Sequence, residues 1–126
     1  MDSVESTRAP EPVGPYPHAR RAGPFLFVSG TGPRRRGSSE IPQGFEAQCR
    51  ATLDNVGAIL GDAGATWDDV VDVTVFLTNM GDLADFRAVR DEFVDPQRPP
   101  ASSLVQVSGL VHPAFRIEIE ALAAAG

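Results

Sequence analysis

The chain has 126 residues, of which 42% are hydrophobic and 22% charged, and these proportions exclude a disordered chain and fit one compact domain. Seventeen acidic residues against eleven basic ones give a net charge of −6, which argues against nucleic acid as a partner. A single cysteine excludes an internal disulfide and a multi-cysteine zinc site, and apolar runs of four or five residues are too short to span a membrane. The acidic, polar start does not resemble a signal peptide, so we expect a cytoplasmic protein.

The amino-terminal third of the chain predicts a tail, two strands and a long loop. Residues 1–12 are rich in Ser, Glu and Pro and lack any periodicity, so we expect a loose tail ahead of a single domain at 13–126. Prolines and a glycine introduce a strand over residues 16–22, and the apolar run at 25–29, which follows a Gly-Pro turn, predicts its partner strand. Glycines, prolines and three consecutive arginines give residues 31–44 the composition and length of a functional loop.

The remaining sequence predicts two helices and three strands. Residues 45–63 form an amphipathic helix whose apolar residues recur at three- and four-residue steps: Phe45, Cys49, Leu53, Val56, Leu60 and Ala63. This spacing places Cys49 in the core, where it is not a nucleophile. Residues 70–78 alternate as a strand, and residues 83–93 predict a second amphipathic helix that ends before a run of prolines. The last two strands are predicted at 102–107 and 115–122.

The predicted order β-β-α-β-α-β-β indicates an α+β fold, a mixed sheet with both helices on one face. Alternation gives the helix-facing side of the sheet two sets of apolar residues: Val71, Val73, Val75 and Leu77, then Phe115, Ile117, Ile119 and Ala121. The opposite side mixes apolar residues such as Phe76 with charged ones such as Arg116 and Glu118. A surface wholly in water would not need the apolar residues, and a buried one would not hold unpaired charges. We therefore expect a partly buried subunit interface, and hence an oligomer.

Six segments carry motifs that agree in order and spacing with one known family: 14–16, 25–30, 75–80, 85–86, 100–107 and 117–120. They resemble the RidA/YjgF family of reactive-intermediate imine and enamine deaminases, and the resemblance covers about residues 12–123. Residues 17–18, 27–31 and 35–36 are most similar to the 2-aminomuconate deaminase branch. The resemblance implies a chorismate-mutase-like homotrimer that binds a small-molecule substrate in clefts between neighbouring subunits. It implies neither a metal ion nor an organic cofactor.

The resemblance also implies a reaction, the hydrolysis of an imine or enamine to a carbonyl compound and ammonia. Glu118 matches the family glutamate that positions and deprotonates water, although a structural salt bridge with Arg116 or a neighbour is the alternative. Tyr16 matches a tyrosine whose hydroxyl contacts substrate or water, unless it only packs at a turn. Ser29 and Gly30 are expected to bind substrate, with the Gly30 N–H facing a carboxylate or carbonyl, unless the glycine only marks a bulge. His18 shares the face of Tyr16 in a regular strand, so it is either a substrate-binding residue that could act as an acid or base, or a surface histidine.

One position departs from the family pattern. Ser102 stands where family deaminases carry an arginine that binds the substrate carboxylate, and Leu104 replaces a cysteine two positions later. A hydrogen bond to a charged group contributes about 1.5–3 kcal/mol, so its loss without replacement predicts loss of the usual activity on amino-acid imines. Ser102 and Ser103 remain candidate donors to a neutral substrate. Arg90, unless it is only a solvated helix residue, or one of Arg34–Arg36 is a candidate for holding an anion. The alternative function is a family member that has lost canonical deamination and binds a small metabolite or acts in a specialised biosynthetic pathway.

Overall fold

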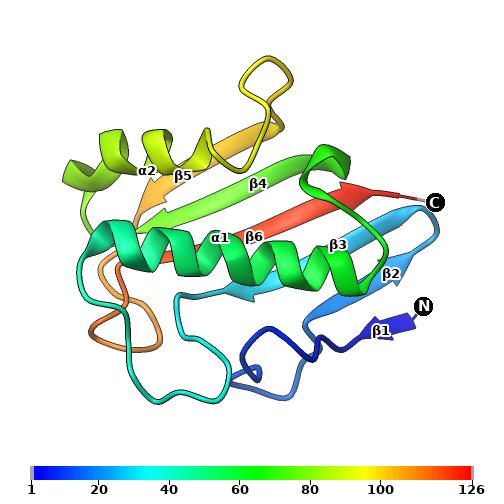
Figure 1. The fold of residues 1–126 in the computed structure, drawn as a ribbon, viewed down its shortest axis with the longest axis horizontal. Helices are drawn as coiled ribbons and strands as arrows, with labels where there is room; N and C mark the ends of the chain where they lie inside the picture. Colours follow the sequence, from blue (N-terminus) through cyan, green and yellow to red (C-terminus); the bar gives the residue numbers. More distant parts are fainter. Residues whose placement is uncertain (1, 126) are drawn as a thin grey trace.

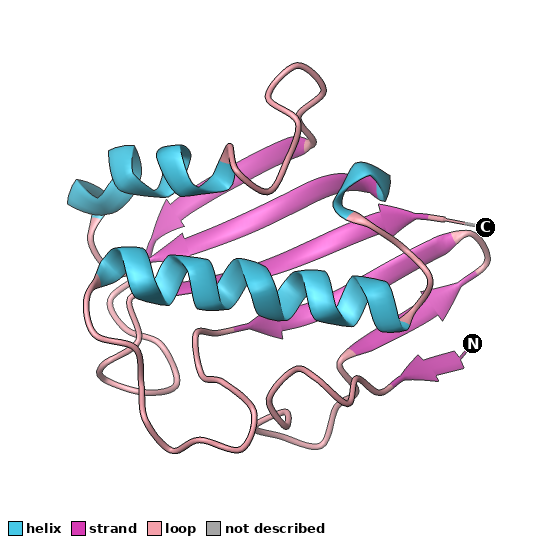
Figure 2. Ribbon diagram, in the orientation of Figure 1, coloured by secondary structure: helices cyan, strands magenta, loops and turns pink. Residues whose placement is uncertain are grey.

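A computed structural model describes residues 2–125, which form one six-stranded mixed sheet with two helices packed on the same face (Figure 1). The elements in chain order are β1 (Asp2–Val4), β2 (Ala19–Ala22), β3 (Phe25–Thr31), α1 (Phe45–Asp62), η1 (Trp67–Asp69), β4 (Val70–Leu77), η2 (Met80–Asp82), α2 (Leu83–Arg90), β5 (Ala101–Gln106) and β6 (Ile117–Ala124). The predicted α+β class with both helices on one face is confirmed (Figure 2). The two 3-10 turns, η1 and η2, were not predicted.

The carboxyl-terminal strand lies in the middle of the sheet. The strand order is β1-β2-β3-β6-β4-β5, so β6 pairs antiparallel with both β3 and β4. Strand β5 forms the far edge and runs parallel to β4, because α2 provides the crossover between these two strands. This order places the end of β3 beside the beginning of β6, and it separates β6 from β5 by one strand.

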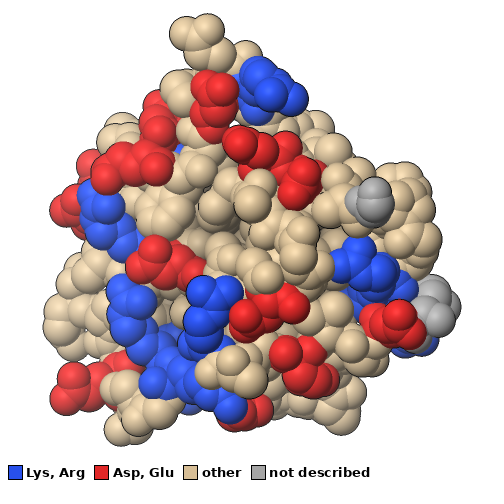
Figure 3. Space-filling view, turned by 45° about the vertical axis from the view of Figure 1, so that its right-hand side comes forward, with Lys and Arg blue, Asp and Glu red and all other residues tan. Residues whose placement is uncertain are grey.

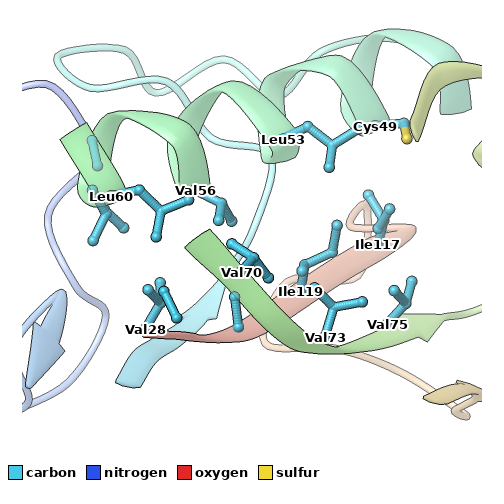
Figure 4. Packing of buried hydrophobic residues seen from close by; sticks show 14 of the residues in the cluster. Val28, Cys49, Leu53, Val56, Leu60, Val70, Val73, Val75, Ile117 and Ile119 are labelled. Atoms are coloured by element: carbon cyan, nitrogen blue, oxygen red, sulfur yellow. The ribbon is translucent and has the colours of Figure 1, made fainter. Parts of the chain in front are cut away.

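The core lies between α1 and the sheet. The predicted apolar stripe of α1 points onto the sheet in Figure 4, and its members Cys49, Leu53, Val56 and Leu60 are buried. They pack against alternate residues of the central strands, among them Val28, Val73, Val75, Ile117 and Ile119. Because removal of apolar surface from water supplies about 25 cal/mol per Å², this stripe fixes the helix on the sheet. The Cys49 side chain is completely buried, which confirms that this cysteine belongs to the core, and the burial raises the pKa of its thiol to about 12.

The prediction that Val71 faces the helices is wrong. Val71 is 46% exposed, whereas Val70 is buried. The register between β4 and β6 shifts at this point, since Val70 pairs with Ala123 and Asp72 pairs with Leu122. The extra residue is Val71, so a β-bulge turns its side chain away from the core while the alternation of Val73, Val75 and Leu77 continues as predicted.

The amino-terminal segment differs from the loose tail expected for residues 1–12. Residues 2–4 form β1, which pairs antiparallel with β2, and Ala9 is completely buried. The Ser6 hydroxyl donates a hydrogen bond of 2.6 Å to the Asp62 carboxylate at the end of α1, and an Arg8 guanidinium N–H donates one of 3.1 Å to the same carboxylate. These contacts join residues more than 50 positions apart, which is why the local composition gave no indication of them.

The face of the sheet opposite the helices carries exposed apolar side chains. Phe25 and Phe27 of β3 and Val105 of β5 are all exposed on the single chain. Charged and polar residues of β4 and β6 lie between them, as the alternation predicted. The subunit interface expected on this face stays a prediction, and these side chains are its physical basis.

Candidate active site

A cavity opens at the end of the sheet where β3 finishes and β6 begins. Its walls come from the amino-terminal segment, the loop after β3 and the residues that lead into β6. Five residues predicted from the sequence line it together: Tyr16, His18, Ser29, Gly30 and Glu118. The antiparallel pairing of β3 and β6 brings these residues together, although Gly30 and Glu118 are far apart in the sequence.

Glu118 is a half-buried carboxylate without a partner. It lies on the outer face of β6 opposite Phe76 of β4, and it makes no hydrogen bond or ion pair with any side chain in residues 2–125. The alternative of a salt bridge with Arg116 does not hold, because Arg116 donates instead to both carboxylate oxygens of Asp82, at 2.8 and 2.9 Å. Burial, with a further contribution from the negative charge of Glu120, raises the pKa of the Glu118 carboxyl group.

The backbone at Gly30 makes room for the Glu118 carboxylate. Between Val28 and Thr31 the register of β3 against β6 shifts, so β3 contains one extra residue in this stretch. A Cβ atom on Gly30 would lie 3.1 Å from both Cδ and Oε2 of Glu118. The glycine therefore does mark a bulge, and the bulge brings main chain and carboxylate close together at the cavity wall.

Tyr16 and Ser29 contribute hydroxyl groups to the cavity in different ways. The Tyr16 side chain is 40% exposed, and its hydroxyl forms no hydrogen bond within the part of the chain that the structure describes. The Ser29 hydroxyl donates a 2.7 Å hydrogen bond to the carbonyl of Pro17, and the Ser29 N–H donates to the carbonyl of His18. Tyr16 is thus free to contact a ligand, whereas Ser29 holds the cavity wall together and keeps lone pairs for accepting.

His18 lines the cavity, but both of its ring nitrogens are occupied. Nδ1 accepts a 2.9 Å hydrogen bond from the Ser6 N–H, which makes Nε2 the protonated nitrogen, 2.7 Å from the carbonyl of Pro10. The ring is 5% exposed, so it is not the surface histidine considered as an alternative. Its contacts fix the amino-terminal segment that forms one wall of the cavity.

Arg90 lies away from this cavity. It belongs to the last turn of α2, where its guanidinium group lies 3.0 Å from the Asp91 carboxylate and 5.7 Å from the centre of the Phe86 ring. It borders a different, apolar hollow between α2 and the sheet. In the single chain these contacts fit the alternative of a helix-surface residue better than a residue that holds an anion beside Glu118.

The predicted substrate-binding residues of β5 also lie outside the cavity. Ser102 and Leu104 pair with Val73 and Val75 and share their helix-facing side, while Ser103 lies on the outer side. Strand β4 separates all three from β6, so none reaches Glu118 of its own chain. Their role in substrate binding stays a prediction that requires a second copy of the chain.

The arginines of the loop after β3 were predicted only as a group, and the structure separates them. Arg34 lines the cavity. Arg35 lies 3.5 Å from the Asp54 carboxylate on α1, and Arg36 donates a 2.8 Å hydrogen bond to the carbonyl of Ala9.

Phe115 is a cavity residue that was not predicted, although the alternation that predicted its burial could have placed it at the entrance to β6.

Basic and acidic side chains are unevenly distributed over the surface seen in Figure 3. Arginine side chains join into one basic cluster at the lower left of this view, with acidic side chains along its edges. Neither helix of the described chain combines the length and apolar character that a membrane crossing requires.

Comparison with known proteins gives one consistent result. The profile of the family described as Endoribonuclease L-PSP matches residues 6–125. A RutC family protein of Pyrococcus horikoshii is 42% identical over 121 residues, which are 95% of this chain and 94% of that protein. The 2-iminobutanoate/2-iminopropanoate deaminase of Escherichia coli K12 is 35% identical over 123 residues, 96% of this chain and 95% of that protein. The crystal structure of E. coli TdcF with bound serine, a protein named as a reactive intermediate deaminase, matches with a TM-score of 0.93 at 35% identity over the whole of both chains.

Proposed function

The chain belongs to the Endoribonuclease L-PSP family, which is the RidA/YjgF family, and from this premise we propose that it hydrolyses a small imine or enamine to a carbonyl compound and ammonia. The observation that carries the proposal is the unpaired Glu118 carboxylate in a cavity beside Gly30 and Tyr16. A buried ionisable group without a partner lowers stability, so its presence in a cavity supports a chemical role. The names of the relatives support the reaction class.

The reaction needs a base and an acid but no redox step. An enamine first tautomerises to the imine, water adds to the carbon of the C=N bond, and the carbinolamine then loses ammonia as the C=O bond forms. The imine and one water become one carbonyl compound and one ammonia. Glu118 accepts a proton from the attacking water and returns it to the nitrogen, and its raised pKa improves this second transfer near neutral pH. The Tyr16 hydroxyl orients the water or the substrate.

The cleft of the proposed enzyme lies between subunits of a homotrimer. The exposed Phe25, Phe27 and Val105 supply apolar surface for the subunit contact. In this arrangement the edge strand β5 of one copy reaches the cavity of another, where Ser102 and Ser103 act as hydrogen-bond donors. A dicarboxylate similar to 2-aminomuconate is the finer substrate proposal, and it rests on the branch resemblance of the amino-terminal motifs.

One observation favours a second candidate function. Ser102 replaces the carboxylate-binding arginine that the family resemblance predicts, so the chain can be a binding protein of the same fold without canonical deamination. The endoribonuclease named in the family description receives no support from the charge, since a net charge of −6 opposes binding of a polyanion.

The test is ammonia release from 2-iminobutanoate and 2-iminopropanoate, which an amino-acid oxidase generates during the assay, and from 2-aminomuconate, which is supplied separately. We expect the protein to accelerate release from at least one of them, and Glu118→Gln to reduce the rate about 10²- to 10⁴-fold. Glu40→Gln is the matched control, because Glu40 is an exposed carboxylate in the loop, outside the cavity. Unchanged release in E118Q refutes the assigned base, and no release by the intact protein on any substrate favours the second function.

A further inference from the structure

The cavity contains one cation that the proposed reaction does not use. Of the three consecutive loop arginines, Arg35 is paired with Asp54 and Arg36 donates to the carbonyl of Ala9. The Arg34 guanidinium group, in contrast, forms no hydrogen bond and no ion pair with a described residue, although it lines the same cavity as Glu118.

The backbone around Arg34 is fixed before any ligand arrives. Pro33 is fully buried, and the Asn55 side chain of α1 is only 4% exposed. The Asn55 amide donates two hydrogen bonds to this loop, one of 3.0 Å to the carbonyl of Gly32 and one of 2.7 Å to the carbonyl of Arg34. The first helix therefore positions the loop, and the loop presents one particular arginine to the cavity.

The Arg34 side chain is also held in place, although its guanidinium group has no hydrogen-bond partner among the described residues. Its Cζ atom lies 5.6 Å from the centre of the Phe115 ring, a cation–π contact within the cavity wall. Its Nε atom is buried and has no hydrogen-bond partner. A buried donor left unpaired costs free energy, and a planar guanidinium group recovers it best by donating two parallel hydrogen bonds to a carboxylate.

We propose that Arg34 binds the substrate carboxylate, which Ser102 cannot do in place of the arginine that the family pattern has at position 102. This inference rests on the proposed deaminase function and deepens it. Arg34 and Glu118 line one cavity without pairing, so a ligand fits between them with its carboxylate on the guanidinium group and its C=N carbon toward Glu118. Val111 and Phe115 line the same space. The substrate class is therefore an imine or enamine that carries at least one carboxylate, which includes the dicarboxylate proposed above.

The experiment measures carboxylate preference in the intact protein. The probes are 2-oxobutanoate and its neutral counterpart 2-oxobutanamide, whose dissociation constants are compared by calorimetry or ligand-observed NMR. We expect the wild-type protein to bind the acid about 10- to 150-fold more tightly than the amide, the range for hydrogen bonds to a charged group. In Arg34→Gln the ratio of the two dissociation constants falls to near one. Arg34→Lys keeps the charge but not the two parallel N–H donors of the guanidinium group, and it gives an intermediate ratio.

Arg35→Gln is the matched control, because it removes the adjacent positive charge outside the cavity and should leave the ratio unchanged. Since the ratio compares two probes on one variant, a general loss of affinity or stability in R34Q does not imitate the expected result. A wild-type protein without preference for the acid, or an R34Q variant that keeps the wild-type preference, overturns the proposal. If the preference depends on Arg34 but no imine is hydrolysed, the carboxylate site stands and the deaminase function fails.

Discussion

Asn55 allows the positioning of the cavity loop to be tested by stability as well as by binding. Its two hydrogen bonds to the loop carbonyls connect α1 to the segment that carries Arg34. Asn55→Ala removes both donors and leaves the two carbonyl groups of Gly32 and Arg34 in a largely buried place. Each lost hydrogen bond is worth about 0.5–1.5 kcal/mol and an unsatisfied group adds to that, so we expect the free energy of unfolding to fall by about 2–4 kcal/mol.

Thr52→Val provides a matched control on the same helix. Thr52 is completely buried, and its hydroxyl donates a 2.9 Å hydrogen bond to the carbonyl of Gln48 within α1, not to the loop. Its loss should cost about 1 kcal/mol. Both variants are compared by urea unfolding at one chain concentration, since association would change the apparent stability.

A second readout separates a structural role from a positioning role. When the loop loosens, the preference for 2-oxobutanoate over 2-oxobutanamide should decrease in Asn55→Ala and remain unchanged in Thr52→Val. The reasoning is refuted if N55A is no less stable than T52V, or if its carboxylate preference equals that of the wild-type protein.

Two further predictions follow from buried ionisable groups. Because burial raises the pKa of Glu118 in the folded state, the folded protein binds this proton more tightly than the unfolded chain does. The resulting contribution to the free energy of unfolding is fully present below the ordinary pKa of 4.5 and is lost as the pH rises through the raised value. The melting temperature of Glu118→Gln should therefore match that of the wild-type protein below pH 4.5 and exceed it near pH 7. Glu40→Gln should show no such trend. A melting temperature of E118Q below that of the wild-type protein at neutral pH contradicts the expected direction. The thiol of Cys49, with a pKa raised to about 12, should not react with iodoacetamide at pH 8 in the native protein but should react in urea, and mass spectrometry of the labelled chain distinguishes the two.

The fold could be predicted from the sequence wherever one periodicity extended over a whole element. The stripe of α1 and the alternation of β6 each bury apolar residues at a fixed spacing, so these elements follow from local sequence. The prediction for Val71 failed for a different reason. A bulge depends on how β4 pairs with β6, and the spacing of apolar residues in β4 alone does not predict that pairing. Strand β1 was missed for a similar reason, since its only partner is β2 and its neighbouring residues are held by contacts with α1.

The candidate site was predictable to the extent that it lies on paired strands. The family motifs predicted Gly30 and Glu118 as site residues but not which strands pair, and the pairing of β3 with β6 brings the two residues together. Which loop arginine faces the cavity was not predictable, because the loop conformation depends on distant contacts such as the hydrogen bond from Asn55, 21 residues away from Arg34 along the chain. The occupation of both His18 nitrogens depended in the same way on the fold of a segment expected to be loose.

Ser102 lies on β5 and Arg34 in the loop after β3, and these positions give the proposed change of carboxylate-binding residue a structural consequence. Position 102 lies on an edge strand, separated by β4 from the strand that carries Glu118, so a carboxylate-binding residue there acts only on the cavity of another copy. Arg34 and Glu118, in contrast, line one cavity of one chain. If Arg34 holds the carboxylate, the cation and the base that the reaction needs both come from one chain and lie at the same end of its sheet. In the proposed homotrimer, contact between subunits would then shape and close the cleft without supplying its charge.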